Sequence, residues 1–120
     1  MQILHTAFRD HWAEALETGA YTWSTRGRTL AEEGFLHASR PDQVEGVLER
    51  YYADVDRADL VLLVIDTDLL DVPWRNDPVG DDTYPHIYGP LSPSAVVGTR
   101  VLHLWTARYD LFAVRSSIAW

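Results

Sequence analysis

Apolar residues in this chain gather in short runs that are separated by polar segments. The clearest run extends from Leu60 to Ile65 and ends at Asp66, which is the pattern of a central strand buried on both faces. Shorter stretches with a strand-like pattern lie at residues 2–6, 35–38, 86–88 and 96–105. The hydrophobic pattern therefore predicts one long central strand with several shorter partners.

Helical spacing marks two further segments. In the first, apolar residues recur from Trp12 to Leu16, and Gly19 stands where a C-terminal cap belongs. In the second, we expect Ser39 to cap an amphipathic helix that has Pro41 in its first turn. The apolar face of this second helix would be formed by Val44, Val47, Leu48 and Tyr51.

Polar segments connect these elements. Residues 21–28 have no helical period and are predicted to form a loop, after which Thr29 and Glu32 form a capping box for one helical turn. Residues 69–74 are predicted to form a short edge segment, and residues 75–83, with three Asp, a mobile loop. The whole pattern predicts an α+β fold, in which a bent sheet, mixed or antiparallel, carries two main helices.

Composition narrows the classes of function. The 120 residues suffice for one domain with its own core. Cysteine and lysine are both absent, which excludes disulfides, thiolate catalysis, Schiff-base chemistry and a P-loop lysine. The net charge of −8 disfavours a nucleic-acid backbone as partner, because phosphates require a basic surface. Neither a signal sequence nor a membrane-spanning run is apparent, so we expect a cytoplasmic protein without membrane contacts.

Two segments each place one histidine within an apolar or aromatic stretch. The first histidine motif, Glu-Gly-Phe-Leu-His-Ala-Ser at residues 33–39, contains His37. The second histidine motif, Pro-His-Ile-Tyr-Gly-Pro-Leu at residues 85–91, contains His86. A histidine at a strand end beside loops can present its imidazole to a ligand, whereas the alternative is a ring whose hydrogen bonds are satisfied inside the core. His37 and His86 are the candidate catalytic residues.

The predicted surroundings of His37 favour an anionic ligand. If Ser39 caps the following helix, the strand end and the helix amino end meet beside His37 and offer free N–H groups to a phosphate. Two arginines in the glycine-containing loop are candidates to clamp a phosphate or carboxylate, or else to pair with surface carboxylates. The candidate ligand-binding residues from the pattern are His5, Thr6, Arg26, Arg28, Ser39 and Tyr88.

Histidines on strand ends also suggest zinc, since three imidazoles and a water form a known catalytic arrangement. The spacing argues against this alternative, because the chain has no His-x-His or His-x-x-x-His pair. In addition, no carboxylate stands at a helpful offset from His37 or His86. We therefore expect no metal ion.

The order of motifs along the chain is similar to that of a known bacterial family. The motifs lie between residues 2 and 100 and are His5-Thr6, Trp12-x-x-Ala15, Gly19-x-Tyr21, the first histidine motif, Gln43, Tyr51-Tyr52, the strand ending at Asp66, Val72-Pro73-Trp74, and the second histidine motif followed by Ala95-Val96. In this order they resemble domain-of-unknown-function family 952. Members are often labelled glutathione S-transferase-like, but this chain is too short for the two domains of that architecture.

The resemblance implies an ADP-ribosyltransferase-like fold that binds NAD in the cleft of a split, bent sheet. RNA 2′-phosphotransferases of that fold group carry a second-strand His-x-Ser, which His37-Ala38-Ser39 matches. Their first-strand His-x-Thr is matched only in part, since nothing separates His5 from Thr6. By this analogy His37 contacts the adenosine or phosphate portion of a dinucleotide, Tyr21 or Tyr88 stacks on a ring, and the activity is ADP-ribosyl or phospho transfer.

One departure from the family leaves catalysis open. The family usually continues Trp-Glu after its valine segment, but Trp74 is followed here by Arg75. The protein would then either bind without catalysis or use a carboxylate of the adjoining loop, namely Asp77, Asp81 or Asp82. The alternatives are therefore a non-catalytic small-molecule binding protein on the same scaffold and, less favoured, a histidine-ligated metal enzyme. An acid held near His37 and His86 would favour catalysis.

The resemblance also suggests a division of the chain. We expect a family-like α+β domain at residues 1–106 and a C-terminal extension at residues 107–120 that lies outside the resemblance. Because burial of large apolar side chains is favourable, we expect this extension to dock on its own domain or across a homodimer interface. The apolar residues concerned include Leu111, Phe112, Val114, Ile118 and Trp120.

Overall fold

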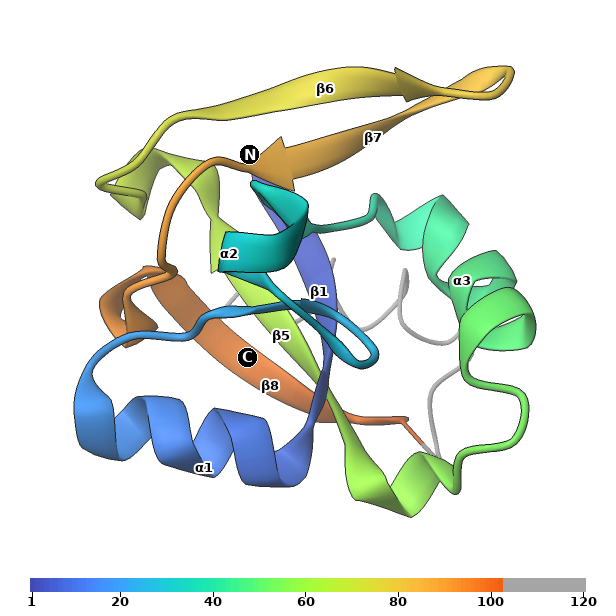
Figure 1. Ribbon diagram of the computed structural model, residues 1–120, viewed down its shortest axis with the longest axis horizontal. Helices are drawn as coiled ribbons and strands as arrows, with labels where there is room; N and C mark the ends of the chain where they lie inside the picture. Colours follow the sequence, from blue (N-terminus) through green and yellow to red (C-terminus); the bar gives the residue numbers. More distant parts are fainter. Residues whose placement is uncertain (103–120) are drawn as a thin grey trace.

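The computed structural model describes residues 1–102 (Figure 1). The helices are α1 (Arg9–Thr18), α2 (Leu30–Glu33) and α3 (Val44–Tyr51), and the short 3-10 turns are η1 (Pro41–Gln43), η2 (Arg57–Asp59), η3 (Thr67–Leu69) and η4 (Pro93–Ala95). The strands are β1 (Gln2–Phe8), β2 (Trp23–Thr25), β3 (Arg28–Thr29), β4 (Leu36–His37), β5 (Leu60–Asp66), β6 (Trp74–Val79), β7 (Asp82–Ile87) and β8 (Val96–Val101).

The first sheet has the strand order β1–β5–β8, and both of its pairings are antiparallel. β5 lies in the centre, as its continuous apolar run predicts. Because successive side chains of a strand point to opposite faces, the two strands β1 and β5 supply two separate cores. One core contains Ile3, Ala7, Leu63 and Ile65, and the other contains Leu4, Leu62 and Val64.

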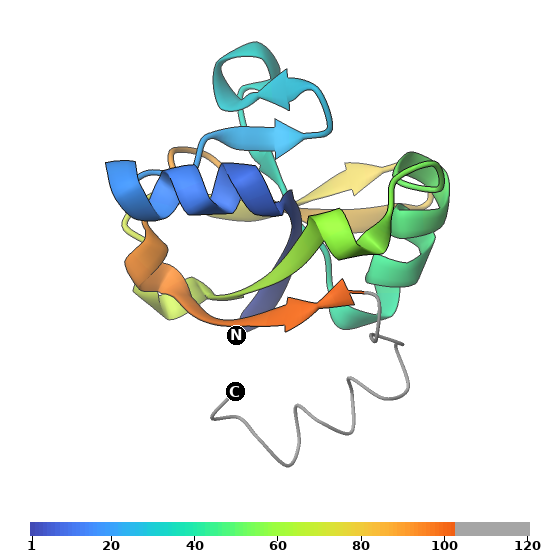
Figure 2. The same cartoon turned by 90° about the horizontal axis from the view of Figure 1, so that it is seen from below.

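The two predicted main helices are present and pack on different cores. Ala15 of α1 joins the first core, and Leu48 of α3 joins the second. Figures 1 and 2 show α1 and α3 on opposite sides of β1. Gly19 ends α1 with a φ of +86°, as predicted. Tyr51, predicted on the buried face, is instead 57% exposed, because α3 ends there and the non-helical backbone of Tyr52 turns that residue inward.

The second sheet has the order β4–β7–β6 and is also antiparallel. An isolated bridge between Leu4 and Ser39 connects it to β1. The α+β class with two main helices is therefore confirmed. Every strand pairing in the described part of the chain is antiparallel, which selects the antiparallel alternative over the mixed one. The strands form two antiparallel sheets and a small hairpin rather than one bent sheet.

Two predicted loops are hairpins. Residues 21–28 contain β2, which pairs with β3, and residues 75–83 lie mostly within β6 and β7, which pair from Trp74–Ile87 to Val79–Asp82. The predicted edge segment at residues 69–74 precedes the real edge strand, β6. Gly80 turns the second hairpin with a φ of +61°. The strands were missed because both sides of these hairpins carry polar residues, so the alternation that marks a half-buried strand is absent.

Ser39 does not cap a helix. Its N–H donates to the Leu4 carbonyl (2.7 Å) and its carbonyl accepts the Leu4 N–H (2.8 Å), so strand geometry continues through it. The turn that follows is η1, where the side chain of Gln43 accepts the N–H of Arg40 (2.9 Å). Because α3 begins only at Val44, no free helix amino end meets His37 at Ser39.

The last part of the chain is only partly described. β8 ends at Val101, and residues 103–105 of the predicted strand lie outside the described residues. The extension at residues 107–120 and its expected docking also lie outside them. Within residues 1–102, no helix is both long enough and apolar enough to cross a membrane.

Candidate functional site

A cavity of about 560 Å³ lies between the two sheets and α3. Its walls come from β1, the β2–β3 hairpin, α2, β4, α3 and the tip of the β6–β7 hairpin, and Figure 1 shows these elements around one region of the fold. Small-molecule sites commonly measure about 300–1,000 Å³. From the strands, His5, Thr6, His37 and Ser39 line the cavity. The space is therefore sized for a metabolite rather than a single ion.

His37 lines the cavity and has one ring nitrogen without a partner among the described residues. Its Nε2 lies 3.1 Å from Oε1 of Glu33, and Arg28 donates to the other carboxylate oxygen of Glu33 (2.8 Å). These hydrogen bonds lower the pKa of Glu33, that from His37 most strongly, so the carboxylate stays ionised. A carboxylate accepts, which assigns the ring proton to Nε2. Nδ1 has no hydrogen-bond partner among the described residues and is not buried.

His5 holds the backbone of His37 in place. Its Nδ1 donates to the backbone carbonyl of His37 (2.5 Å), and its Nε2 accepts the hydroxyl of Tyr21 (2.9 Å). Burial lowers the pKa of His5 to about 4, so the ring is neutral at pH 7. Burial also raises the pKa of the Tyr21 hydroxyl. With both ring nitrogens in use, His5 fixes the position of β4 rather than exchanging protons with a ligand.

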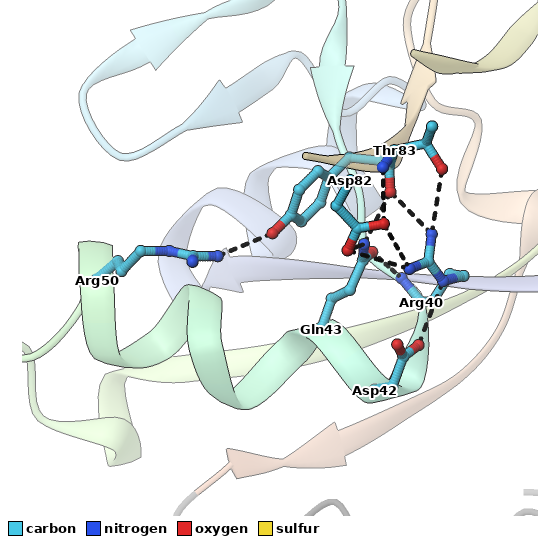
Figure 3. Close-up of polar contacts among 7 residues, drawn as sticks. Arg40, Asp42, Gln43, Arg50, Asp82 and Thr83 are labelled. Atoms are coloured by element: carbon cyan, nitrogen blue, oxygen red, sulfur yellow. Dashed lines mark hydrogen bonds and ion pairs between the residues drawn. The ribbon is translucent and has the colours of Figure 1, made fainter. Parts of the chain in front are cut away.

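Arginine and tyrosine side chains form another wall of the cavity. Arg26 pairs with both carboxylate oxygens of Asp54, one of them at 3.0 Å. Arg50 of α3 donates to the hydroxyl of Tyr84 (2.8 Å), a contact drawn in Figure 3, and its guanidinium lies 5.9 Å from the centre of the Tyr51 ring. Within residues 1–102, no carboxylate pairs with Arg50. The charge of Arg50 is therefore available to an anion.

A polar cluster fastens the β6–β7 hairpin to the segment before α3 (Figure 3). We call Arg40, Gln43, Asp82 and Thr83 the hairpin clamp. Arg40 and Gln43 donate to the carboxylate of Asp82 (3.1 and 3.0 Å), and Gln43 also donates to the carbonyl of Thr83 (2.8 Å). The hydrogen bonds from Gln43, the Thr83 N–H and Arg40 lower the pKa of Asp82 to about 2. The clamp holds the hairpin tip, with Tyr84, against the cavity.

His86 belongs to a separate cluster. Its Nδ1 lies 2.8 Å from Oδ2 of Asp77, which also accepts the hydroxyl of Tyr88. The guanidinium of Arg75 lies 4.4 Å above the Tyr88 ring, and Phe35 stacks on the His86 ring at 4.0 Å. Burial lowers the pKa of His86 although Asp77 opposes this shift. None of these five side chains lines the cavity.

A family comparison agrees with the order of motifs. The family described as "Protein of unknown function (DUF952)" matches residues 6–99. The chain belongs to the DUF952 family. No curated protein matches it.

The fold is similar to that of protein CC0527 from Caulobacter crescentus. A crystal structure of CC0527 has 25% sequence identity and a TM-score of 0.67, covering 83% of this chain and 84% of that one. The solution NMR structure of CC0527 has 26% identity and a TM-score of 0.64, covering 83% of each chain. This DUF952 member therefore shares its architecture with an experimentally determined structure.

The cavity unites only some of the predicted site residues. His37 and His86 are paired across β4 and β7, and their ring centres lie 5.1 Å apart on one face of the sheet. Even so, His86 and Tyr88 do not line the cavity that His37 lines, because their side chains hydrogen-bond to Asp77. Tyr21 and Arg28 stand behind the lining, where they hold His5 and Glu33. The predicted residues that line the cavity are His5, Thr6, Arg26, His37 and Ser39.

Sequence reasoning missed the acids beside both histidines. Glu33 lies four residues before His37 in the same motif, and the αL turn at Gly34 brings them together. That spacing was a usable signal. Asp77 reaches His86 only through the register of β6 and β7, which the loop prediction concealed. Within residues 1–102, no group of three or more ligating side chains is placed to hold a metal ion.

Proposed function

We propose that this DUF952 protein binds a nucleotide, with NAD as the first candidate, in the cavity beside His37. The observation that carries the proposal is the guanidinium of Arg50, which pairs with no carboxylate of residues 1–102 and lies at a cavity of metabolite size. In a chain with a net charge of −8, such a cation beside a pocket favours anionic ligands locally. The proposal assumes the cytoplasmic location expected from the sequence.

Arg50 is suited to the phosphate groups of such a ligand. A guanidinium presents several N–H donors in a fixed plane and binds phosphate through paired hydrogen bonds. Its guanidinium donates to the Tyr84 hydroxyl and lies near the Tyr51 ring, and no carboxylate of residues 1–102 pairs with it. A phosphate can therefore bind without breaking an existing ion pair of Arg50. Arg26 is less suited, because Asp54 already holds both of its terminal nitrogens.

The remaining lining supplies groups for a base and a ribose. Tyr51, Tyr52 and Tyr84 bring aromatic surface to the wall that carries Arg50. The hydroxyls of Thr6 and Ser39 lie on the strand side with His37, where they can hydrogen-bond to sugar hydroxyls. A pocket with aromatic walls and a few polar groups is typical of small-molecule sites.

NAD is the first candidate because the family resemblance implies an ADP-ribosyltransferase-like fold. Such an analogy concerns the scaffold and does not by itself carry an activity. Arg75, which stands where the family usually has Glu, lies outside the cavity, so this exchange removes no acid from its wall. Glu33 supplies a carboxylate next to His37. This contact favours ADP-ribosyl or phospho transfer over the alternative of a non-catalytic binding protein.

Calorimetry with paired ligands tests the proposal. NAD, ADP-ribose, AMP, adenosine and nicotinamide are titrated into the wild-type protein and into Arg50→Gln. We expect AMP to bind more tightly than adenosine, and Arg50→Gln to weaken AMP about tenfold while adenosine is unaffected, because a hydrogen bond to a charged group contributes about 1.5–3 kcal/mol.

Arg9→Gln is the matched control. Arg9 is exposed on α1, and among residues 1–102 its polar contact is one long hydrogen bond to the Ala58 carbonyl (3.4 Å), so its replacement should leave every affinity unchanged. Failure of all five ligands to bind at millimolar concentration would overturn the proposal. Binding of adenosine as tight as that of AMP would exclude the phosphate site at Arg50.

A further inference from the structure

We infer that His37 is a proton acceptor for a hydroxyl group of the bound ligand, acting through Nδ1, and that Glu33 is its positioning residue. The inference rests on the proposed function, because it requires a hydroxyl-bearing ligand in the same cavity. In the step itself, the O–H bond of the ligand breaks and an N–H bond forms at Nδ1. The electron pair of the O–H bond remains on the oxygen, which becomes a stronger nucleophile.

The hydrogen bonds of the ring determine which nitrogen can act. The Nε2–H of His37 donates to the Glu33 carboxylate (3.1 Å), so the lone pair of the neutral ring lies on Nδ1. Nδ1 has no partner among the described residues and is not buried. A carboxylate on one ring nitrogen fixes the tautomer and the orientation of the ring, as it does for histidines that bind metals.

The ring nitrogen opposite Nδ1 also faces a carboxylate. When Nδ1 takes a proton, the ring becomes a cation whose Nε2–H already points at an ionised carboxylate, the arrangement by which an acid stabilises the imidazolium of a catalytic triad. Arg28 holds the other oxygen of Glu33 (2.8 Å), which fixes the carboxylate in place. Glu33 and Arg28 thus form a chain of charged groups that leads to His37 from the protein surface.

Packing holds the His37 ring in one orientation. Phe35 and His86 both meet it edge to face, with ring centres 4.9 and 5.1 Å away. The Nδ1–H of His5 donates to the backbone carbonyl of His37 (2.5 Å). A catalytic group gains from such restraint, since a displacement of about 1 Å can cost two orders of magnitude in rate.

The other described histidines lack this combination. Both nitrogens of His5 are hydrogen-bonded, and Nε2 of His86 is buried. His11 stacks on Trp23 with ring centres 4.0 Å apart and has no hydrogen-bonded carboxylate among residues 1–102. Among these residues, only His37 joins an accessible ring nitrogen to a carboxylate on the opposite nitrogen.

Chemical modification of the ligand-free protein tests the inference. Diethyl pyrocarbonate reacts with the unprotonated nitrogen of a neutral imidazole, so the rate at each histidine, followed by peptide mass spectrometry at pH 8, reports its nucleophilicity. We expect His37 to react faster than His5 and His86. Glu33→Ala and Glu33→Gln should slow His37 about tenfold, the lower end of the loss when a histidine loses its carboxylate partner.

Glu49→Gln is the control for the removal of one carboxylate, because Glu49 is exposed on α3 and should leave the rate at His37 unchanged. Nitrogen-15 NMR of the wild-type protein adds a measurement independent of reactivity, with Nδ1 of His37 unprotonated in the neutral ring. Circular dichroism verifies that the Glu33 variants are folded.

An unchanged rate at His37 in folded Glu33 variants, or a proton on Nδ1 in the neutral ring, would overturn the inference. Because no nucleotide is present, these outcomes are independent of whether the proposed ligand binds. If nucleotides fail to bind but the modification rates change as expected, then nucleotide binding is the proposal that fails. The inference that His37 is a proton acceptor positioned by Glu33 would still stand.

Discussion

The first and second histidine motifs place the same side chain in opposite surroundings. His37 and His86 are directly paired on neighbouring strands, and each ring has a carboxylate within 3.1 Å. Yet the side chain of His37 is 38% exposed and lines the cavity, whereas that of His86 is 4% exposed and does not. Two directly paired positions on neighbouring strands thus hold one side chain that can meet a ligand and one that supports the fold.

The source of each carboxylate explains the difference. Glu33 comes from the same motif, on the turn that precedes β4, so it holds His37 through Nε2 and leaves Nδ1 without a partner among the described residues. Asp77 comes from the neighbouring strand and is shared with Tyr88 and Arg75. That sharing, together with the stacking of Phe35, encloses His86. Histidine with an acid partner is therefore insufficient to identify a site, and the unpartnered nitrogen is the informative feature.

The largest expected difference between the two motifs is the loss of stability when the glycine of each is replaced by alanine. In the second motif, a Cβ on Gly89 would lie 2.6 Å from a side-chain carbon of Val72, at a φ of +156°. We expect Gly89→Ala to lower the free energy of unfolding by about 4 kcal/mol, from overpacking and backbone strain together. In the first motif, Gly34 has a φ of +89° and open space around it, so Gly34→Ala should cost only about 1 kcal/mol.

Urea denaturation of both variants measures this difference. Equal losses would show that the second motif is no more tightly packed than the first. Both glycines have a positive φ, but at +156° the backbone cost of a side chain exceeds that at +89°, so the excess at Gly89 reports its backbone strain and its contact with Val72 together.

Removal of the two histidines gives the next largest difference. His86→Ala deletes a buried ring that stacks on Phe35 and donates to Asp77, and we expect it to lower the free energy of unfolding by about 3 kcal/mol. His37→Ala should cost about 1 kcal/mol or less, because its ring is partly exposed. The same denaturation series measures both, and a larger loss for His37 than for His86 would reverse the assignment of roles.

A lower pH should reduce the stability of the protein through His5, which hydrogen-bonds to the backbone of the first histidine motif. Burial lowers the pKa of His5 from 6.5 to about 4, so between these values the unfolded chain binds a proton that the folded protein does not. Stability therefore falls as the pH drops, by about 2 kcal/mol from this residue between about pH 7.5 and 5. Denaturation at both pH values measures the fall, and His5→Gln should reduce it. An identical pH dependence in His5→Gln would show that His5 is not the cause.

Sequence patterns predicted the parts of the fold that are apolar. The run from Leu60 to Ile65 identified β5, because a strand buried on both faces has no polar positions to confuse it. The capping box at Thr29 and Glu32 is present, and Gly19 ends α1 as expected. Each of these signals is local, because the residues that determine the backbone geometry lie within a few positions of one another in the sequence.

The hairpins and half of the site could not be predicted in this way. β6 and β7 carry Arg75, Asp77 and Asp82, whose polarity is that of a loop, and only cross-strand hydrogen bonds make them strands. Ser39 has the residue type and position of a helix N-cap, but its backbone N–H and carbonyl are hydrogen-bonded to Leu4 in a β-bridge. Arg50 joins the cavity through the packing of α3, a long-range contact without a local signal.

The smallest expected effect concerns the hairpin clamp, which supports the second motif at a distance from both histidines. Gln43, the Thr83 N–H and Arg40 lower the pKa of Asp82 to about 2, so the clamp is intact above the ordinary value of 3.8 and is lost as the pH falls toward 2. At neutral pH, Asp82→Asn weakens these contacts, and it should raise amide hydrogen exchange in β6 and β7 severalfold with little change in melting temperature.

Asp81→Asn is the matched control, since Asp81 is exposed in the adjoining turn and is not part of the clamp. Faster exchange confined to the hairpin would show that the clamp acts locally on the wall of the cavity. Unchanged exchange in Asp82→Asn would mean that strand pairing alone holds the hairpin, and the contrast between the motifs would then depend on Phe35 and Asp77 without help from the clamp.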